Sequence, residues 1–272
     1  MKIGVRGHDY GKGSPEVIAK RLSDEGYEAV QLAIPKSIEG IESYDQVSDD
    51  LISRIRNAFS AKKIEVSVLG CYVDLSNPDN AIRLEAVRTF CRGLEVAVGL
   101  GARVTGTETS YEHLGKLEKR RRFPCLMESL EIINEKANSL NADFAIEPVA
   151  WNPLEDVETA REVTEKLGKH SRIILDLANV LENPNIIQQD SYWRYVFELL
   201  GDKISAIHLK DFVTDTDGKY RPMLLGEGVL QYDVLEEWLR GKESMPVLRE
   251  EMNPETAAHD ICFMQDMKRR TE

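Results

Sequence analysis

Eight apolar segments of strand length divide this 272-residue chain into similar units, and each is followed by a stretch with helical periodicity. The segments span residues 2–8, 28–34, 64–73, 102–110, 143–149, 172–180, 204–212 and 245–252. Alternating strands and helices indicate a parallel sheet, and eight such units in roughly 250 residues are typical of a closed barrel. A doubly wound open sheet would normally need fewer strands, and no GxGxxG motif opens the first helix. We therefore predict an α/β protein, a (β/α)8 TIM barrel that forms a single domain over residues 1–272.

Start and stop signals define several of the helices. Ser14 is a suitable N-cap, Pro15 stands in the first helical turn, and Gly26 follows the last periodic residue. The segments 77–102 and 156–168 show comparable signals, with glycines at their ends. We predict helices over these three segments.

Composition and charge exclude several classes of function. The net charge of −12 disfavours nucleic acid as a partner, because such binding depends largely on neutralising phosphates; the basic cluster at 116–123 is better explained as a solvated loop or helix start. No apolar run approaches the length of a membrane span, and the first residues lack the apolar core of a signal peptide. The four cysteines are scattered without a CxxC pair, which is typical of free thiols in a reducing compartment. We expect a cytoplasmic protein without a nucleic-acid or membrane partner.

The carboxyl ends of the last four predicted strands each carry an ionisable residue. Glu147, Asp176 and His208 end the fifth, sixth and seventh strands, and Glu250 or Glu251 ends the eighth. The active site of a (β/α)8 barrel lies at these ends, so polar residues there carry more functional weight than elsewhere. Because the four strands are consecutive, their end residues should face one another.

Three carboxylates and one imidazole at these positions predict a site for a single divalent metal. Packed together without a cation, the carboxylates would raise one another's pKa. Oxygen ligands with one histidine favour Mn²⁺, with Mg²⁺, Co²⁺, Fe²⁺ or Zn²⁺ as alternatives, and the absence of thiolates argues against structural zinc. Taken singly, each residue has a plainer explanation as a helix cap, a surface charge or a hydrogen-bonded core histidine. Their occurrence at four consecutive strand ends favours the metal.

Motifs along nearly the whole chain carry a family resemblance. Glu-Pro-Val, Leu-Asp-Leu-Ala-Asn, His-Leu-Lys-Asp and Glu-Glu follow one another at the ends of the last four strands. The front half adds VRGHDYG (5–11), LGCYVDLSNPDN (69–80) and LGARVTGTETS (100–110). In this order the motifs resemble the xylose isomerase-like barrels. These include sugar and sugar-phosphate isomerases and epimerases, with relatives in inositol catabolism and DNA repair.

The resemblance implies roles for the four strand-end residues. Glu147, Asp176, His208 and the strand-eight glutamate would hold the metal, which would bind a carbonyl and a hydroxyl oxygen of the substrate. Glu147 and the strand-eight glutamate would also act as the catalytic pair, one removing a proton from carbon and the other returning it. The metal would stabilise the resulting enediolate as a Lewis acid. The family's Pro-x-x-x-Glu spacing favours Glu250 over Glu251, and side-chain alternation then directs Glu251 to the other side of the strand.

Three further residues are expected beside these ligands. Lys210 and Asp211 would orient His208 or bind a substrate oxygen, and an internal ion pair between them is an equal alternative. Asn179 stands where the DNA-repair branch has a histidine. Because the chain has only five histidines, the trinuclear zinc site of those nucleases is excluded. We place Asn179 next to the ligand set, together with Asp211.

Other strand ends supply candidate substrate-binding residues. These positions lie at or near the ends of the first five strands and the seventh, and Arg6 accompanies His8. The candidates are His8, Lys36, Tyr72, Glu108, Trp151 and Lys210. Packing beneath loops would equally explain the aromatic members. The glycine turn at 226–228 precedes a predicted helix and is a candidate cover for the site.

These observations predict a metal-dependent isomerase or epimerase of a small sugar or related hydroxy-carbonyl compound, acting by proton transfer through a metal-bound enediolate. A dehydratase or lyase acting on a keto-inositol-type substrate shares the first proton abstraction and stays open. A sugar-binding barrel without turnover is the third reading, because a fold does not fix a function. Barrels of this kind commonly pair, so a homodimer is the expected assembly.

Overall fold

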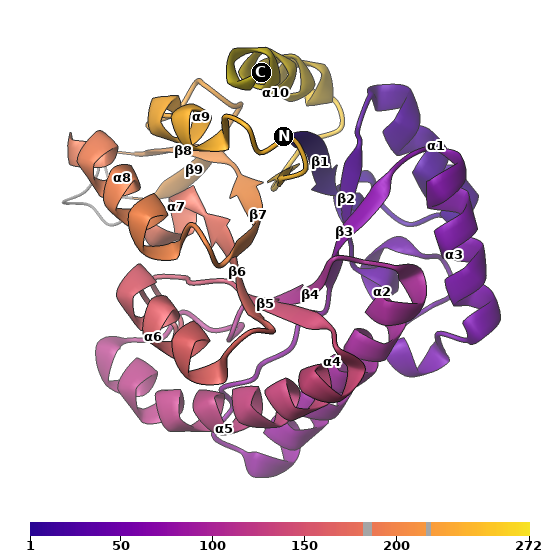
Figure 1. Ribbon diagram of the computed structural model, residues 1–272, viewed down its shortest axis with the longest axis vertical. Helices are drawn as coiled ribbons and strands as arrows, with labels where there is room; N and C mark the ends of the chain where they lie inside the picture. The colour runs from indigo at the N-terminus through magenta and orange to yellow at the C-terminus, as the bar shows by residue number, and fades with distance from the viewer. Residues whose placement is uncertain (182–186, 216–218) are drawn as a thin grey trace.

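A closed barrel of eight parallel strands forms the centre of the computed structural model, which describes residues 1–181, 187–215 and 219–272 (Figure 1). The strands follow one another around the barrel in the order β1, β10, β7, β6, β5, β4, β3, β2. Their bounds are β1 Lys2–Arg6, β2 Ala29–Leu32, β3 Glu65–Gly70, β4 Val104–Thr107, β5 Asp143–Ile146, β6 Ser171–Asp176, β7 Ile204–Leu209 and β10 Pro246–Arg249. The predicted (β/α)8 barrel is confirmed.

Helices surround the barrel on its outer side (Figure 1). The long helices are α1 Pro15–Glu25, α3 Asp49–Ala61, α4 Asn80–Leu100, α5 Lys116–Leu140, α6 Val157–Leu167, α8 Gln189–Leu200, α9 Asp233–Leu239 and α10 Ala257–Thr271. Short helical turns follow three of the strands: Gly7–Tyr10, α2 Ile34–Ser37 and α7 Leu177–Val180. A further short turn covers Tyr44–Gln46. The basic cluster at 116–123 opens α5, as the helix-start reading predicted.

The predicted capping signals act as expected at two of the helices. The Ser14 side chain accepts a hydrogen bond from the Val17 amide, and Gly26 adopts the left-handed conformation (φ 94°) that ends α1. Asp156 accepts a hydrogen bond from the Thr159 amide at 2.7 Å and so caps α6.

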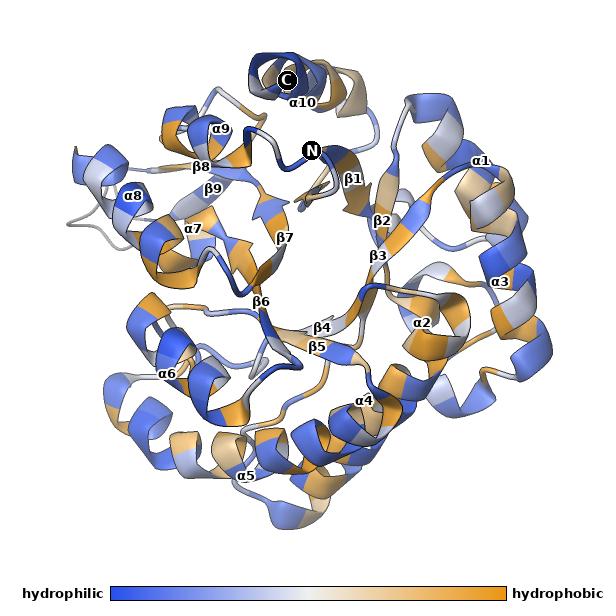
Figure 2. Cartoon of the chain, in the orientation of Figure 1, coloured by the Kyte–Doolittle hydropathy of each residue, from blue (hydrophilic) through white to orange (hydrophobic). Residues whose placement is uncertain are grey.

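The barrel interior is filled with side chains and is not a pore. Seven strands each contribute one residue to an inner apolar cluster: Ala29, Val68, Val104, Ala145, Ile174, Ala206 and Leu248. The remaining strand, β1, has Gly4 at this level of the barrel. A Cβ on Gly4 would overlap the side chain of Leu248 and the backbone of Ala29. A second, larger apolar layer lies between strands and helices, and hydrophilic residues cover the outer helix faces (Figure 2). This packing leaves the carboxyl ends of the strands as the place for polar side chains.

All eight predicted strands extend past the observed carboxyl ends, and the sixth and seventh show a structural cause. The sixth stops at Asp176, because its side chain caps α7 through the Ala178 and Asn179 amides. The seventh stops at Leu209, and the chain then forms an antiparallel hairpin of β8 Asp211–Thr214 and β9 Tyr220–Met223. Because apolar residues alternate through both β7 and β8, the sequence pattern does not reveal the break at Lys210. Among the described residues, no helix has the length and apolar character needed to cross a membrane.

Candidate metal centre

Four of the predicted residues meet at the carboxyl end of the barrel. Asp176 and His208 are paired in register on β6 and β7, Glu147 directly follows β5, and Glu250 directly follows β10. One potential ligand atom from each lies within 4.8 Å of the others. All four side chains are buried, with at most 3% of each residue exposed. We call Glu147, Asp176, His208 and Glu250 the quartet.

Two buried atoms of the quartet make no hydrogen bond, although charged groups lie close to them. Asp176 uses Oδ1 to accept the amides of α7, and its Oδ2 has no hydrogen bond. His208 uses Nε2 to contact Gln31, and its Nδ1 has no hydrogen bond although it lies 3.1 Å from Glu147 Oε2. Buried polar atoms of this kind are costly unless a ligand completes them. Together with the carboxylate–imidazole donor set, they fit one divalent cation.

Two basic side chains partly compensate the carboxylates. The Lys210 ammonium lies 3.1 Å from Asp176 Oδ2 and 3.3 Å from Glu250 Oε2. Arg6 donates to the other oxygen of Glu250 at 2.5 Å. Lys210 therefore forms internal ion pairs, and its partners are two carboxylates of the quartet.

Opposed pKa shifts show how strongly the quartet groups interact. Burial would lower the pKa of His208, but the carboxylates of Glu147 and Glu250 raise it to about 9. Burial raises the pKa of Asp176 well above its usual range. Burial would also raise the pKa of Glu250, yet Lys210 and His208 hold it well below. A divalent cation at the unpaired atoms would lessen the repulsion that these shifts express.

Three of the predicted substrate-binding residues form a group beside the quartet. The rings of His8 and Tyr72 lie edge to face at 5.8 Å, and the Lys36 ammonium lies 4.1 Å above the Tyr72 ring. Burial and the nearby cations Arg6 and Lys36 lower the pKa of His8 to about 3, so its imidazole is neutral. Lys36 and Tyr72 also line a cavity of about 180 Å³.

Glu108 and Trp151, also predicted to bind substrate, have different surroundings. Burial, and next the charge of Glu147, raise the pKa of Glu108 to about 7. This places Glu108 within electrostatic reach of the quartet. The Trp151 ring instead stacks on His113, with centroids 4.6 Å apart.

Arg249 and Glu251 lie outside the quartet, although the Glu251 carboxylate comes within 3.9 Å of the Lys210 ammonium. Glu251 has a left-handed backbone (φ 55°), its side chain is 37% exposed, and it accepts a hydrogen bond from Tyr220 at 2.8 Å. Arg249 donates to Asp260 of α10 at 2.6 Å. The geometry therefore brings Glu250, rather than its neighbour, into the quartet.

Asp211 and Asn179 contact different parts of the site. Asp211 is fully buried, and its carboxylate accepts hydrogen bonds from the amides of Phe212, Gly226, Gly228 and Leu230. It thus holds in place the glycine turn that was predicted as a candidate cover for the site. Asn179 donates to Glu147 Oε1 at 2.6 Å and leaves Oε2 directed at His208.

Sequence reasoning missed Gln31. This residue is 1% exposed at the carboxyl end of β2, where its amide contacts both His208 and Tyr72. The available signal was a polar residue inside an otherwise apolar strand, "AVQLA", near the barrel end that holds the site.

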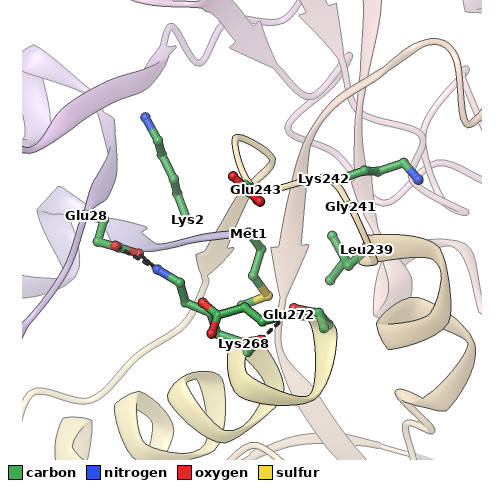
Figure 3. A pocket seen from close by; sticks show the side chains of 10 residues that line it. Met1, Lys2, Glu28, Leu239, Gly241, Lys242, Glu243, Lys268 and Glu272 are labelled. Carbon is green, nitrogen blue, oxygen red and sulfur yellow. Dashed lines mark hydrogen bonds and ion pairs between the residues drawn. The ribbon is translucent and has the colours of Figure 1, made fainter.

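A cavity of about 460 Å³ lies at the opposite end of the barrel, and no quartet residue lines it. Figure 3 shows its wall, formed by the start of β1, the segment before β10 and the end of α10, with Lys268 paired to Glu28. The quartet, unlike this cavity, gathers three carboxylates and an imidazole that could hold a metal ion, so the quartet is the stronger candidate site.

Fold and site together define a (β/α)8 barrel with a candidate metal centre at the carboxyl ends of its strands. Residues 19–267 match the family described as xylose isomerase-like TIM barrel, and the chain belongs to that family. The resemblance seen in the sequence is confirmed. No curated protein matches the chain significantly in sequence.

Solved structures share the architecture at low sequence identity. The 3-keto-D-glucoside 4-epimerase YcjR from E. coli is 14% identical with a TM-score of 0.75, and the match covers 98% of this chain and 99% of that chain. The probable 3-DHS dehydratase AsbF from Bacillus anthracis is 14% identical with a TM-score of 0.73, over 97% and 99% of the two chains. An IOLI protein with a binding zinc atom is 18% identical with a TM-score of 0.71, over 100% and 98%. At these identities the similarity shows the fold alone.

Proposed function

We propose that this protein is a divalent-metal-dependent isomerase or epimerase of a small sugar or related hydroxy-carbonyl compound. The observation that carries the proposal is the buried quartet, in which one atom each of Asp176 and His208 makes no hydrogen bond. Mn²⁺ is the favoured occupant, because three of the four ligands are carboxylates, and Mg²⁺, Co²⁺ or Zn²⁺ are alternatives. A solved structure of similar fold is described with zinc, which supports a metal here. An epimerase among the structures of similar fold supports the reaction class.

The chain's own residues supply the proton transfer in this proposal. Glu147 and Glu250 both face His208, with carboxylate oxygens 3.1 and 3.5 Å from its Nδ1. A substrate carbon held between them would lose a proton to one carboxylate and regain a proton from the other. Arg6 and Lys210 keep Glu250 ionised, which suits it to accept the proton. When bound, the metal supplies a Lewis acid that polarises the substrate carbonyl.

The residues around the quartet would orient the substrate and exclude water. His8, Lys36 and Tyr72 lie on the side of β1 to β3 and offer a neutral imidazole, an ammonium and an aromatic face. Such groups suit the hydroxyls and apolar faces of a sugar. We propose that they bind the part of the substrate that does not react.

A dehydratase is the second candidate function. The solved structure described as a probable 3-DHS dehydratase has the same fold, and its name favours this alternative. Both reactions begin with removal of a proton from carbon, so the same carboxylates would serve. Product analysis by NMR separates them, because epimerisation retains every oxygen and dehydration loses one.

The metal content of the purified protein tests the proposal. Mass spectrometry should find about one divalent metal per chain after Mn²⁺ is supplied, and an Asp176→Ala, His208→Ala double variant should lose it. A matched control is Asp143→Ala, His170→Ala, which removes another Asp–His pair (2.7 Å) that is not part of the quartet. This control should keep the metal.

A second measurement tests turnover. Ketoses and keto-inositols are incubated with the metal-loaded protein in D₂O, and deuterium at carbon is followed by NMR. Incorporation of deuterium at carbon supports the proposed enzymatic activity. Sugar binding without exchange would overturn the proposal in favour of a non-catalytic binding barrel, and a metal-free native protein would overturn the metal site itself.

A further inference from the structure

Gln31 joins the quartet to the opposite side of the barrel through two hydrogen bonds, one buried and one partly buried. Its Oε1 lies 2.7 Å from His208 Nε2, and its Nε2 donates to the Tyr72 hydroxyl at 2.7 Å. Gln31 and His208 are 177 positions apart in sequence, and each is about 1% exposed. Both ends of the Gln31 amide are therefore committed to a partner away from solvent.

This arrangement determines which nitrogen of His208 keeps its proton when the other nitrogen binds a metal. An amide oxygen only accepts hydrogen bonds, so a contact with Gln31 Oε1 requires a proton on His208 Nε2. The other nitrogen, Nδ1, faces Glu147 and Glu250 and has no hydrogen bond. A histidine binds a metal through an unprotonated nitrogen, and its orientation is set by the bond that its other nitrogen makes.

We propose that Gln31 is a positioning residue that holds His208 with its proton on Nε2 and so presents Nδ1 to the metal. The inference rests on the proposed metal site and adds to it a residue on β2, outside the four strands that carry the quartet.

The local structure favours a side chain with two polar ends at this position. Gly70 of β3 lies alongside, and a Cβ there would come within 3.4 Å of Gln31 Cγ and Nε2. An aliphatic residue at position 31 would leave His208 Nε2 without its buried acceptor, which is more costly than the bond is worth.

The test uses Zn²⁺ alone as the probe and two variants of Gln31. Gln31→Leu removes the oxygen that accepts the His208 hydrogen bond, whereas Gln31→Glu replaces the amide oxygen with a carboxylate oxygen that can still accept it. We expect Gln31→Leu to weaken Zn²⁺ binding by about 10- to 100-fold in a competition titration with a chelator. Gln31→Glu should stay within about threefold of the native protein or bind more tightly, because the acceptor is retained.

A control separates positioning from a general loss of packing. Ser205→Ala also removes a buried hydrogen bond from the barrel wall, since Ser205 donates to the Ile173 carbonyl at 3.1 Å. Its Zn²⁺ affinity should equal that of the native protein.

A spectroscopic measurement on the native protein needs no variant at position 31. In a long-range ¹H–¹⁵N spectrum of the Zn²⁺-loaded protein, the His208 signals should show a protonated Nε2 and a metal-bound Nδ1. The His208 signals are assigned by their absence in His208→Ala, which leaves four of the five histidines.

The outcomes distinguish this inference from the proposed function. If Zn²⁺ binds the native protein through His208 Nε2, or if Gln31→Leu binds Zn²⁺ as tightly as the native protein, the role of Gln31 is wrong and the metal site stands. If the native protein binds no Zn²⁺, or binds it unchanged in the Asp176→Ala, His208→Ala variant, the proposed metal site is wrong, and the inference with it.

Discussion

The two ends of the barrel both collect charged side chains, but they arrange them differently. At the carboxyl end, the quartet is buried, and Lys210 and Arg6 share its charge among several ion pairs. At the amino end, the ion pairs are partly exposed: Lys268 pairs with Glu28, and Lys2 and Arg103 pair with Glu65 (Figure 3 shows the first).

This difference indicates which end has to bind something. Partly exposed pairs contribute little free energy and need no further partner. Buried carboxylates are costly unless cations and hydrogen bonds compensate them, and one atom each of Asp176 and His208 makes no hydrogen bond. Changes at the carboxyl end should therefore alter function and metal-linked stability, whereas changes at the amino end should alter stability alone.

The largest effect is expected from Glu250→Gln, with Glu251→Gln as the matched control. The first removes a buried carboxylate from the quartet, and the second alters a side chain that is 37% exposed and not part of the quartet. The rate of deuterium incorporation from D₂O into substrate should fall by about 10²- to 10⁴-fold for Glu250→Gln and change little for Glu251→Gln. Equal losses in the two variants would contradict the assignment of Glu250.

Lys210→Met tests whether the ammonium and the metal compensate the same carboxylates. Without metal, the variant leaves Asp176 and Glu250 short of a cation, and we expect it to lose about 3–5 kcal/mol of unfolding free energy. With saturating Mn²⁺ the loss should shrink, because the ion takes over the compensation. Urea unfolding in the presence of EDTA and of Mn²⁺ measures the loss of unfolding free energy under each condition. The same loss under the two conditions would show that Lys210 acts independently of a metal.

A smaller effect is expected from Asp211→Ala, which leaves the amides of the 226–230 turn without their carboxylate. We expect a loss of about 1.5–3 kcal/mol, because these hydrogen bonds are buried and charge-assisted. Gly228→Ala should be destabilising as well, since a Cβ there would overlap the Asp211 carboxylate. Glu227→Ala alters an exposed residue of the same turn and should leave the free energy of unfolding near that of the native protein.

The barrel and the quartet could both be predicted from the sequence, because each follows from the positions of residues along single strands. Asp176 and His208 end consecutive strands, so their meeting requires only the barrel. Gln31 could not be assigned in this way, because its contact with His208 depends on the spatial approach of β2 across the barrel. The role of Asp211 likewise depends on a turn 15 to 19 positions later, and the hairpin that leads there has the same alternation as the strand before it.

The smallest effect is expected at the amino end, from Glu28→Gln. Burial alone would raise the pKa of Glu28, but hydrogen bonds from Lys268 and the Ile3 amide lower it below the ordinary value of 4.5. Ionised Glu28 therefore adds stability above about pH 4.5, and this contribution is lost as the pH falls through the pKa of the folded state. Because the side chain is 41% exposed, we expect the variant to lose only about 0.2–1 kcal/mol at pH 7.

Urea unfolding of the native protein and Glu28→Gln at pH 7 and pH 3 measures this loss, which should be smaller at pH 3. The Mn²⁺ affinity, measured beside it at pH 7, should be the same in both proteins, because the amino end shares no residue with the quartet. A variant that weakened Mn²⁺ binding would show that the packed barrel interior transmits changes from one end to the other. The charges at the amino end would then belong to the function, and the division between the two ends would fail.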